Sequence, residues 1–464
     1  MTLIPPADIL DDSVDTRRYW RGVALFVALL LALSVALVAR GGTPRVRALT
    51  LLPAPGSEVS VQPLIRARFS RAMDRASVEP TVRIAPDVPF RVSWNENELR
   101  ILLQAPLQAE ARYRVTVGPG LVDADGIELA GQLQWEFSTR RPRIAFMTGN
   151  NELWLVDPAT EEQKRLTAPG QAVQSVTTTH QGDTLVYTVV ESETATNLWR
   201  MDLQGGGLTK LTDDQNTIYN APQFSPAGDL LAVESRRLVD VGGVTTLAAP
   251  DIELRRPSDG SPAGVIYGAG DEAGHSARWS PDGTQIAFIE SSQGAVAFYN
   301  FTSDLRIFPA ESPSFSQQIW DPASRAIAYA RFYPIDQMVR QVAVIRDGNM
   351  GSELPVLERE ADQSAPAWHP DGSLIAFVQF SAVAGGPGDT LWIVASQRND
   401  AEVALSEPDI IYSEPQWSPD GEWLLFGRVD PTAANGEQAL WMMRLDGSEP
   451  RQLTDEGYKA LWIP

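Results

Sequence analysis

The stretch Trp279-Ser280-Pro281-Asp282-Gly283 recurs in related form along the second part of this 464-residue chain. An aromatic residue, here called the anchor, precedes a turn of the Ser-Pro-Asp-Gly kind at 224–228, 279–283, 320–322, 368–372 and 417–421. A degenerate copy starts at Thr178, and successive anchors are 46, 55, 41, 48 and 49 residues apart. Proline presets φ, aspartate favours an Asx turn and glycine tolerates positive φ, so each copy predicts a tight turn.

Strands follow each turn in the same order. An apolar strand such as 286–289 comes first, then a strand with a Leu-Trp pair such as 391–392, and then a short strand near Leu-Thr. Together with the strand that carries the anchor, this makes four strands in every ~46 residues, which is typical of a β-propeller blade. We expect the anchor tryptophans to supply the large apolar area through which neighbouring blades pack.

The two ends of this region complement each other. Residues 144–167 contain the second, third and fourth strands of a blade, whereas 459–464 form a first strand with nothing after it. Joined, they complete one blade and close the ring. Seven blades are then favoured, with six as the alternative, and the anchors lie at 178, 224, 279, 320, 368, 417 and 462.

This array, residues 143–464, resembles the TolB-type, WD-like β-propeller family in its Ser-Pro-Asp-Gly turns and Leu-Trp strands. The resemblance implies the propeller fold. TolB propellers are six-bladed and follow a different N-terminal domain, so the resemblance does not extend to the TolB partners.

Residues 46–140 have a different sequence pattern, in which apolar and polar residues alternate along short predicted strands. In 65–70 the apolar side chains face one way and the arginines the other, and 112–117 repeats the pattern. About seven such strands with Pro/Gly turns predict an antiparallel sandwich. The segment resembles a bacterial Ig-like domain of the SbsA type, with matching motifs at 53–56, 69–74, 123–126 and 135–139. This resemblance implies a spacer or adhesion module.

Residues 22–39 are 18 consecutive uncharged positions dominated by Leu, Val and Ala. As a helix they would span ~27 Å, close to the ~30 Å apolar core of a bilayer. Tyr19 and Trp20 stand where interfacial aromatic residues belong. We therefore expect an uncleaved single-pass transmembrane helix, a cytoplasmic tail over 1–21, and C-terminal domains outside the cytoplasm at the cell membrane. A cleaved signal peptide is the alternative.

Composition excludes several function classes. The net charge is −21, and residues 143–464 alone carry 21 basic against 44 acidic residues, a net charge of −23. Nucleic acid is therefore not an expected partner. There is no cysteine and there are three histidines, of which His180 and His369 fall in the repeated turns. Asp123 and Asp125 supply too few of the ~6 oxygen ligands of calcium and predict a turn. We expect no metal, no cofactor and no catalytic residue.

The sequence favours a non-enzymatic, membrane-anchored cell-envelope protein, in which the Ig-like spacer presents an acidic propeller to a protein or cationic ligand. The connection into each inner strand crosses the face that carries the channel mouth, four or five positions before the anchor. Four residues there are the predicted partner-binding set: Tyr219, His275, Tyr412 and Tyr458. The alternatives are a propeller enzyme acting on an extracellular polysaccharide at the central channel, and the sensory ectodomain of a membrane complex.

Overall fold

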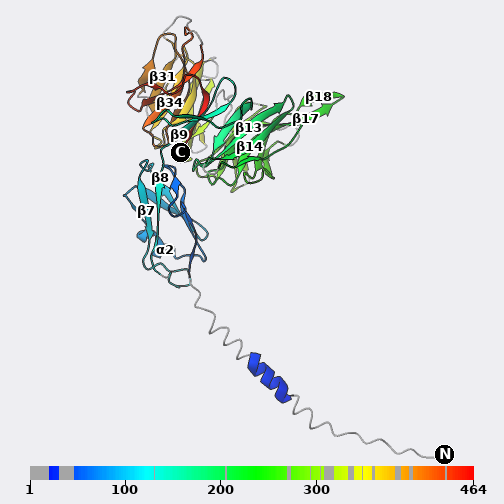
Figure 1. Ribbon diagram of the computed structural model, residues 1–464, viewed down its shortest axis with the longest axis vertical. Helices are drawn as coiled ribbons and strands as arrows, with labels where there is room; N and C mark the ends of the chain where they lie inside the picture. The colour runs from blue at the N-terminus through cyan, green and yellow to red at the C-terminus, as the bar shows by residue number, and fades with distance from the viewer. Residues whose placement is uncertain are drawn as a thin grey trace, which may run out of the picture.

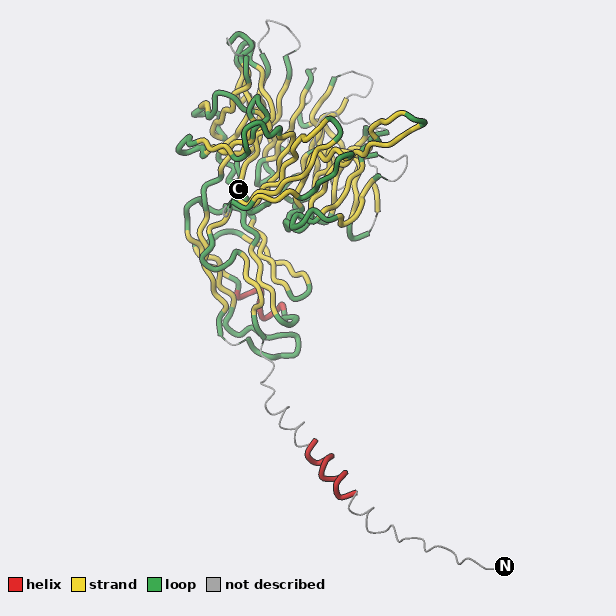
Figure 2. Tube along the Cα trace, turned by 45° about the vertical axis from the view of Figure 1, so that its right-hand side comes forward, coloured by secondary structure: helices red, strands yellow, loops and turns green. Residues whose placement is uncertain are grey.

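The computed structural model is all-β apart from short helices (Figures 1 and 2). It describes residues 20–30, 46–129, 131–203, 206–268, 273–292, 294–303, 305–307, 318–332, 339–346, 349–357, 361–381, 388–396, 401–433 and 436–464.

The expected transmembrane helix at 22–39 is not borne out. Residues 20–30 are helical, and 31–39 lie outside the described residues. In the described part of the chain, no helix combines the length and apolar character needed to cross a membrane. The single-pass topology and the cell-membrane location predicted from 22–39 are therefore corrected.

The first domain is a sandwich of two four-stranded sheets. One sheet has the order β1 (Ala48–Leu52), β3 (Ile65–Phe69), β6 (Glu98–Leu103), β5 (Phe90–Asn95), and the other β2 (Glu58–Val59), β8 (Leu133–Thr139), β7 (Arg112–Val117), β4 (Arg83–Ala85). The α-helix α2 (Arg75–Val78) and the 3-10 helix η1 (Glu79–Thr81) connect the sheets. The alternating apolar side chains of both sheets, including Phe69 and Phe137, fill one shared core. The alternation in the sequence therefore identified the buried face.

The second domain is a propeller with seven four-stranded blades. From inner to outer strand, blade 1 is β37 (Tyr458–Ile463), β9 (Arg143–Met147), β10 (Leu153–Val156), β11 (Gln163–Arg165). Blade 2 is β12 (Val173–Thr178), β13 (Thr184–Ser192), β14 (Ala195–Asp202), β15 (Leu208–Lys210), and blade 3 is β16 (Thr217–Phe224), β17 (Leu231–Val241), β19 (Asp251–Arg255), β20 (Pro262–Tyr267). A parallel bridge between Thr196 and Ile218 joins blades 2 and 3 into one sheet.

The other four blades follow in chain order. Blade 4 is β21 (Gly274–Trp279), β22 (Gln285–Glu290), β23 (Ala295–Asn300), β24 (Leu305–Ile307), and blade 5 is β25 (Ile319–Trp320), β26 (Ala326–Phe332), β27 (Arg340–Arg346), β28 (Asn349–Pro355). Blade 6 is β29 (Gln363–Trp368), β30 (Leu374–Gln379), β31 (Thr390–Ala395), β32 (Ala401–Ser406), and blade 7 is β33 (Ile411–Trp417), β34 (Trp423–Val429), β35 (Gln438–Arg444), β36 (Arg451–Gln452).

The last strand of the chain completes the first blade. β37 pairs antiparallel with β9, and Trp462 lies opposite Ile144. Each inner strand contacts the inner strand of the next blade, and β37 contacts both β33 and β12. The ring is therefore closed by a strand from the far end of the sequence, as the incomplete blades at the two ends predict.

Four of the five anchor tryptophans join neighbouring blades through their indole N–H groups. Trp320 Nε1 donates to Arg278 O at 3.1 Å, and Trp417 Nε1 donates to Ala367 O at 3.2 Å. Trp368 and Trp462 repeat this bond to the carbonyl of the residue before the previous anchor. Each of these anchors therefore adds a directed hydrogen bond to the apolar area that we expected it to contribute.

Blade 3 carries a protruding hairpin. β17 continues beyond its pairing with β16 and turns back through Gly242 and Gly243 into β18 (Val244–Leu247). Figures 1 and 2 show this hairpin extending away from the ring.

Candidate functional site

The inner strands share a β-bulge just before the anchor. The strand register shifts at this point in β12, β16, β21, β29, β33 and β37. The third residue before the anchor has positive φ in five of these six strands: Ala221, Ser276, Ala365, Glu414 and Lys459. Positive φ is uncommon for residues other than glycine. Bulges re-aim side chains and are over-represented next to functional sites, so this ring of bulges is the candidate site.

The fourth and fifth residues before the anchor, at the start of each bulge, differ in exposure. The fourth residue before the anchor is half-buried in all six strands: Gln174, Asn220, His275, Ser364, Ser413 and Tyr458. The fifth is buried in all six: Val173, Tyr219, Gly274, Gln363, Tyr412 and Gly457. Because successive residues of a strand point to opposite faces of the sheet, the two positions face different neighbouring blades, and only the fourth keeps part of its surface accessible.

Two of the four predicted binding residues are therefore buried. Tyr219 is 3% exposed and Tyr412 is 1% exposed. Tyr219 Oη donates to Asp214 Oδ2 at 2.6 Å, and Tyr412 Oη donates to Glu407 Oε1 at 2.8 Å. Burial and these acceptors raise the pKa of both hydroxyls. Almost none of either side chain is accessible in this structure, and partner binding by these two residues stays a prediction.

Tyr458 and His275 are half-buried at the fourth position. The Tyr458 hydroxyl donates to Asn151 Oδ1, and burial raises its pKa. His275 Nδ1 lies 3.0 Å from Ser276 Oγ. The two residues are in blades 1 and 4, so the ring places them far apart rather than in one cluster. Partner binding at these positions stays a prediction.

Charged side chains also lie along the inner strands. Glu414 in β33 and Lys459 in β37 occupy the same bulge position in adjacent blades. Surrounding protein raises the pKa of Glu414 by desolvation, and the charge of Lys459 opposes that rise. Lys459 Nζ donates to Gln174 O at 2.9 Å, which links β37 to β12. Burial lowers the pKa of Arg278 to about 10.

Sequence reasoning missed the bulges, although a signal was present. Pro222, Pro366 and Pro415 each stand two residues before an anchor, inside a strand. Proline cannot donate to a strand ladder, so within sheets it is confined to edges, strand starts and bulges. The recurrence of proline at one position of the repeat is therefore a sequence signal for the bulge.

The histidines and paired aspartates that could suggest a metal have structural partners. His369 Nδ1 lies 2.7 Å from Asp371 Oδ1, as Ser280 Oγ does from Asp282 Oδ1 in the equivalent turn. Asp123 Oδ1 accepts hydrogen bonds from the backbone N–H groups of its own turn, and its other oxygen lies 2.6 Å from Arg71 Nε. Across the described residues, no three His, Cys, Asp or Glu side chains are grouped to hold a metal ion.

Comparison with known proteins assigns the first domain. Residues 43–139 match the sequence profile of the family described as bacterial Ig-like domain. Residues 43–139 are a bacterial Ig-like domain. This Ig-like domain coincides with the sandwich described above. A search of curated protein sequences finds no match to the chain.

The structural neighbours include TolB-type β-propellers. TolB from Acinetobacter baumannii has a TM-score of 0.44 and 16% identity, covering 77% of this chain and 81% of its own. A puromycin-hydrolyzing peptidase from Mycobacterium tuberculosis has a TM-score of 0.52 and 12% identity, covering 70% of this chain and 54% of its own. A puromycin hydrolase has a TM-score of 0.52 and 15% identity, covering 69% and 54%. At these identities the last two similarities describe the fold alone.

Proposed function

We propose that the protein is a non-enzymatic binding protein, in which the Ig-like domain supports an acidic propeller whose bulged inner strands receive a basic partner. The repeated bulge carries this proposal. Non-glycine residues at positive φ cost about 1–3 kcal/mol each in unfavourable positions and are concentrated at functional sites. Here such residues recur at one register of adjacent inner strands.

The position of the Ig-like domain leaves the bulged side available. Gln62 Nε2 donates to Pro419 O at 2.7 Å, and the Arg140 guanidinium donates to Gln181 O. Both acceptors belong to turns that follow an anchor, so the Ig-like domain lies on the turn side of the ring. The bulges precede the anchors and lie toward the other side. This arrangement suits a domain that holds the propeller while the opposite face meets the partner.

Charge defines the chemistry of the partner. Residues 143–464 have a net charge of −23. An excess of carboxylates attracts basic partners and accelerates their association, and dissolved salt screens this attraction. We therefore expect the partner to present lysine and arginine side chains, and binding to weaken as ionic strength rises.

A pair of charge-neutralising variants tests the proposal. Glu414→Gln removes a carboxylate at the bulge, and Glu162→Gln removes one from the exposed turn between β10 and β11 in blade 1, at the end of the blade opposite the bulge. A photo-crosslinking residue at Ser364, with a control at Lys164 on the outer strand β11, captures partners from an extract of the source cells. We expect adducts at Ser364 but not at Lys164, weakened by Glu414→Gln and unchanged by Glu162→Gln.

The adducts should also disappear at high salt. Equal yields from Ser364 and Lys164, or equal losses for the two glutamine variants, would place the binding surface elsewhere and overturn the proposal.

A further inference from the structure

The strand register defines one equivalent position in all seven blades. In each blade the residue just before the anchor pairs with a residue of the second strand, and that residue pairs in turn with a residue of the third strand. This third-strand residue is the equivalent position. In blade 2, for example, Thr177 pairs with Val186, which pairs with Arg200. The equivalent residues of blades 1 to 7 are Leu155, Arg200, Leu254, Phe298, Val344, Ile393 and Met442. Six are apolar, and Arg200 alone is charged.

This position faces the anchor of the next blade. Phe298 lies edge-on to Trp320, with ring centroids 5.6 Å apart. The residues of blades 3, 5, 6 and 7 share hydrophobic clusters with the next anchor in the same way: Leu254 with Trp279, Val344 with Trp368, Ile393 with Trp417 and Met442 with Trp462. An arginine here thus interrupts an apolar contact that most other blade junctions keep.

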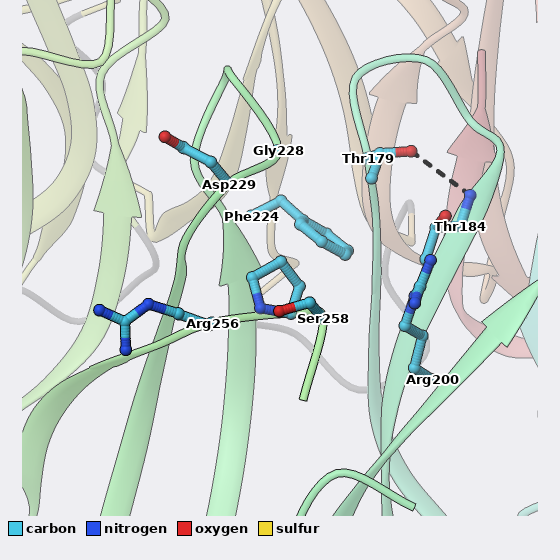
Figure 3. Close-up of a pocket in the computed structure, with 9 residues that line it drawn as sticks. Thr179, Thr184, Arg200, Phe224, Gly228, Asp229, Arg256 and Ser258 are labelled. Carbon is cyan, nitrogen blue, oxygen red and sulfur yellow. Dashed lines mark hydrogen bonds between the residues drawn. The ribbon is translucent and has the colours of Figure 1, made fainter. Parts of the chain in front are cut away.

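The anchor on the other side of this junction is also altered. Blade 3 has Phe224 where blades 4 to 7 and blade 1 have tryptophan. Phenylalanine is smaller and has no N–H to donate. A hollow of about 360 Å³ lies at this junction, and its lining includes Arg200, Phe224, Pro257, Thr179 and Thr184. Figure 3 shows Phe224 on one side, and Thr179, Thr184 and Arg200 on the other.

Arg200 is half-buried, and within the described ranges its side chain makes no hydrogen bond or ion pair. The acidic groups nearby are engaged or turned away. Thr179 Oγ1 donates to Asp183 Oδ1 at 2.5 Å and Ser225 Oγ donates to Asp229 Oδ1 at 2.8 Å. In Figure 3 the carboxylate of Asp229 and the guanidinium of Arg256 both point away from Arg200.

We propose that this junction of blades 2 and 3 binds a small organic carboxylate. The planar guanidinium of Arg200 matches a carboxylate through two parallel hydrogen bonds. Phe224 and Pro257 offer an apolar surface against which a ring-shaped or hydrocarbon body packs. The hollow has a volume at the lower end of small-molecule sites, which limits the ligand to a compact one. This site lies on the turn side of the ring and does not depend on the proposed partner surface.

The test uses benzoate as the probe with the full-length chain. Benzamide has the same ring without the charge, and inorganic phosphate has charge without the ring. Binding is followed by titration calorimetry and by the backbone amide NMR signals of Thr184 and Gly228, which line the hollow. We expect benzoate to bind at least tenfold more tightly than benzamide or phosphate and to shift both signals.

Arg200→Leu restores the apolar residue type of the other six blades, so it should melt no lower than the wild type while losing at least tenfold in benzoate affinity. Arg200→Lys keeps the charge without the planar fork and should bind with intermediate affinity. Arg325→Leu removes an exposed arginine of blade 5 and should bind benzoate like the wild type. Equal binding of benzoate and benzamide, undiminished binding by Arg200→Leu, or no shift of either signal would overturn the proposal.

Discussion

Replacing Trp320 by phenylalanine measures what one indole hydrogen bond contributes to the contact between two blades. Trp320 is half-buried, and its Nε1 donates to Arg278 O at 3.1 Å. Phenylalanine keeps an aromatic ring against Phe298 but leaves the carbonyl of Arg278 without this donor. Trp279 is the matched control, because it is also half-buried and its Nε1 has no hydrogen-bond partner among the described residues.

The expected cost follows from the two losses. The smaller ring removes apolar contact in both variants, at about 1 kcal/mol each. Only Trp320→Phe also breaks a hydrogen bond between two blades, which adds about 1–2 kcal/mol. We therefore expect Trp320→Phe to lower the free energy of unfolding by about 2–3 kcal/mol and Trp279→Phe by about 1 kcal/mol.

Urea unfolding followed by far-ultraviolet circular dichroism measures both values, because this signal does not depend on the replaced indoles. The dependence of stability on urea should be the same in the two variants, so that a shifted midpoint reports stability alone. Equal losses in Trp320→Phe and Trp279→Phe would refute the idea that the indole N–H groups hold adjacent blades together.

Three further outcomes are expected. Deleting residues 458–464 removes the inner strand of blade 1 and exposes two strand edges. Calorimetry should therefore show a lower melting temperature, a less cooperative transition and a free energy of unfolding reduced by several kcal/mol. Unchanged melting would contradict ring closure by β37. His369→Ser keeps the hydrogen bond to Asp371, as serine does in the equivalent turns, but loses the 3.1 Å contact between Nε2 and Gly421 O, so it should lose about 1 kcal/mol and His369→Ala about 2 kcal/mol; identical melting of the two would contradict the role of the Asp371 bond. The hydrogen bond from Arg428 lowers the pKa of Glu407 below its ordinary value of 4.5, so this pair stabilises the fold above that pH and stops doing so as pH falls through the folded-state pKa. Denaturation across pH should therefore show Arg428→Met less stable than wild type at neutral pH, with the gap narrowing in acid.

The blade pattern was predictable because its signals are local. A Pro-Asp-Gly turn and an apolar strand each depend on a few adjacent residues, and tertiary contacts do not override them. The closing strand was predictable for a related reason: each end of the array is an incomplete blade. The apolar segment 22–39 was different, because its prediction rested on hydropathy alone, and no described helix is long and apolar enough to cross a membrane.

The site was harder to predict because it depends on register. Tyr219 and Tyr412 were chosen by distance from the anchor, but a shift of one residue moves a side chain to the opposite face of a strand. The fifth position is therefore buried while Tyr458 and His275, at the fourth, are half-buried. The special position of Arg200 could not be predicted from the sequence for a similar reason. Its blade has Thr178 in place of an aromatic anchor, so its equivalence to Phe298 emerges only from strand pairing.

The closing strand connects the two surfaces of the ring. β37 carries Tyr458 and Lys459 at the bulge, and at its other end the carbonyl of Pro464 accepts a hydrogen bond from Arg140 of the linker that follows the Ig-like domain, at 2.8 Å. Gly182 of blade 2 packs against the same carbonyl with φ of +62°, where a Cβ atom would collide with it. The Ig-like domain is thus bonded to the ring at blade 1, whose inner strand, β37, comes from the other end of the sequence than its remaining three strands. A partner that contacts the bulge of β37 therefore acts on the same strand that the Ig-like domain holds in place.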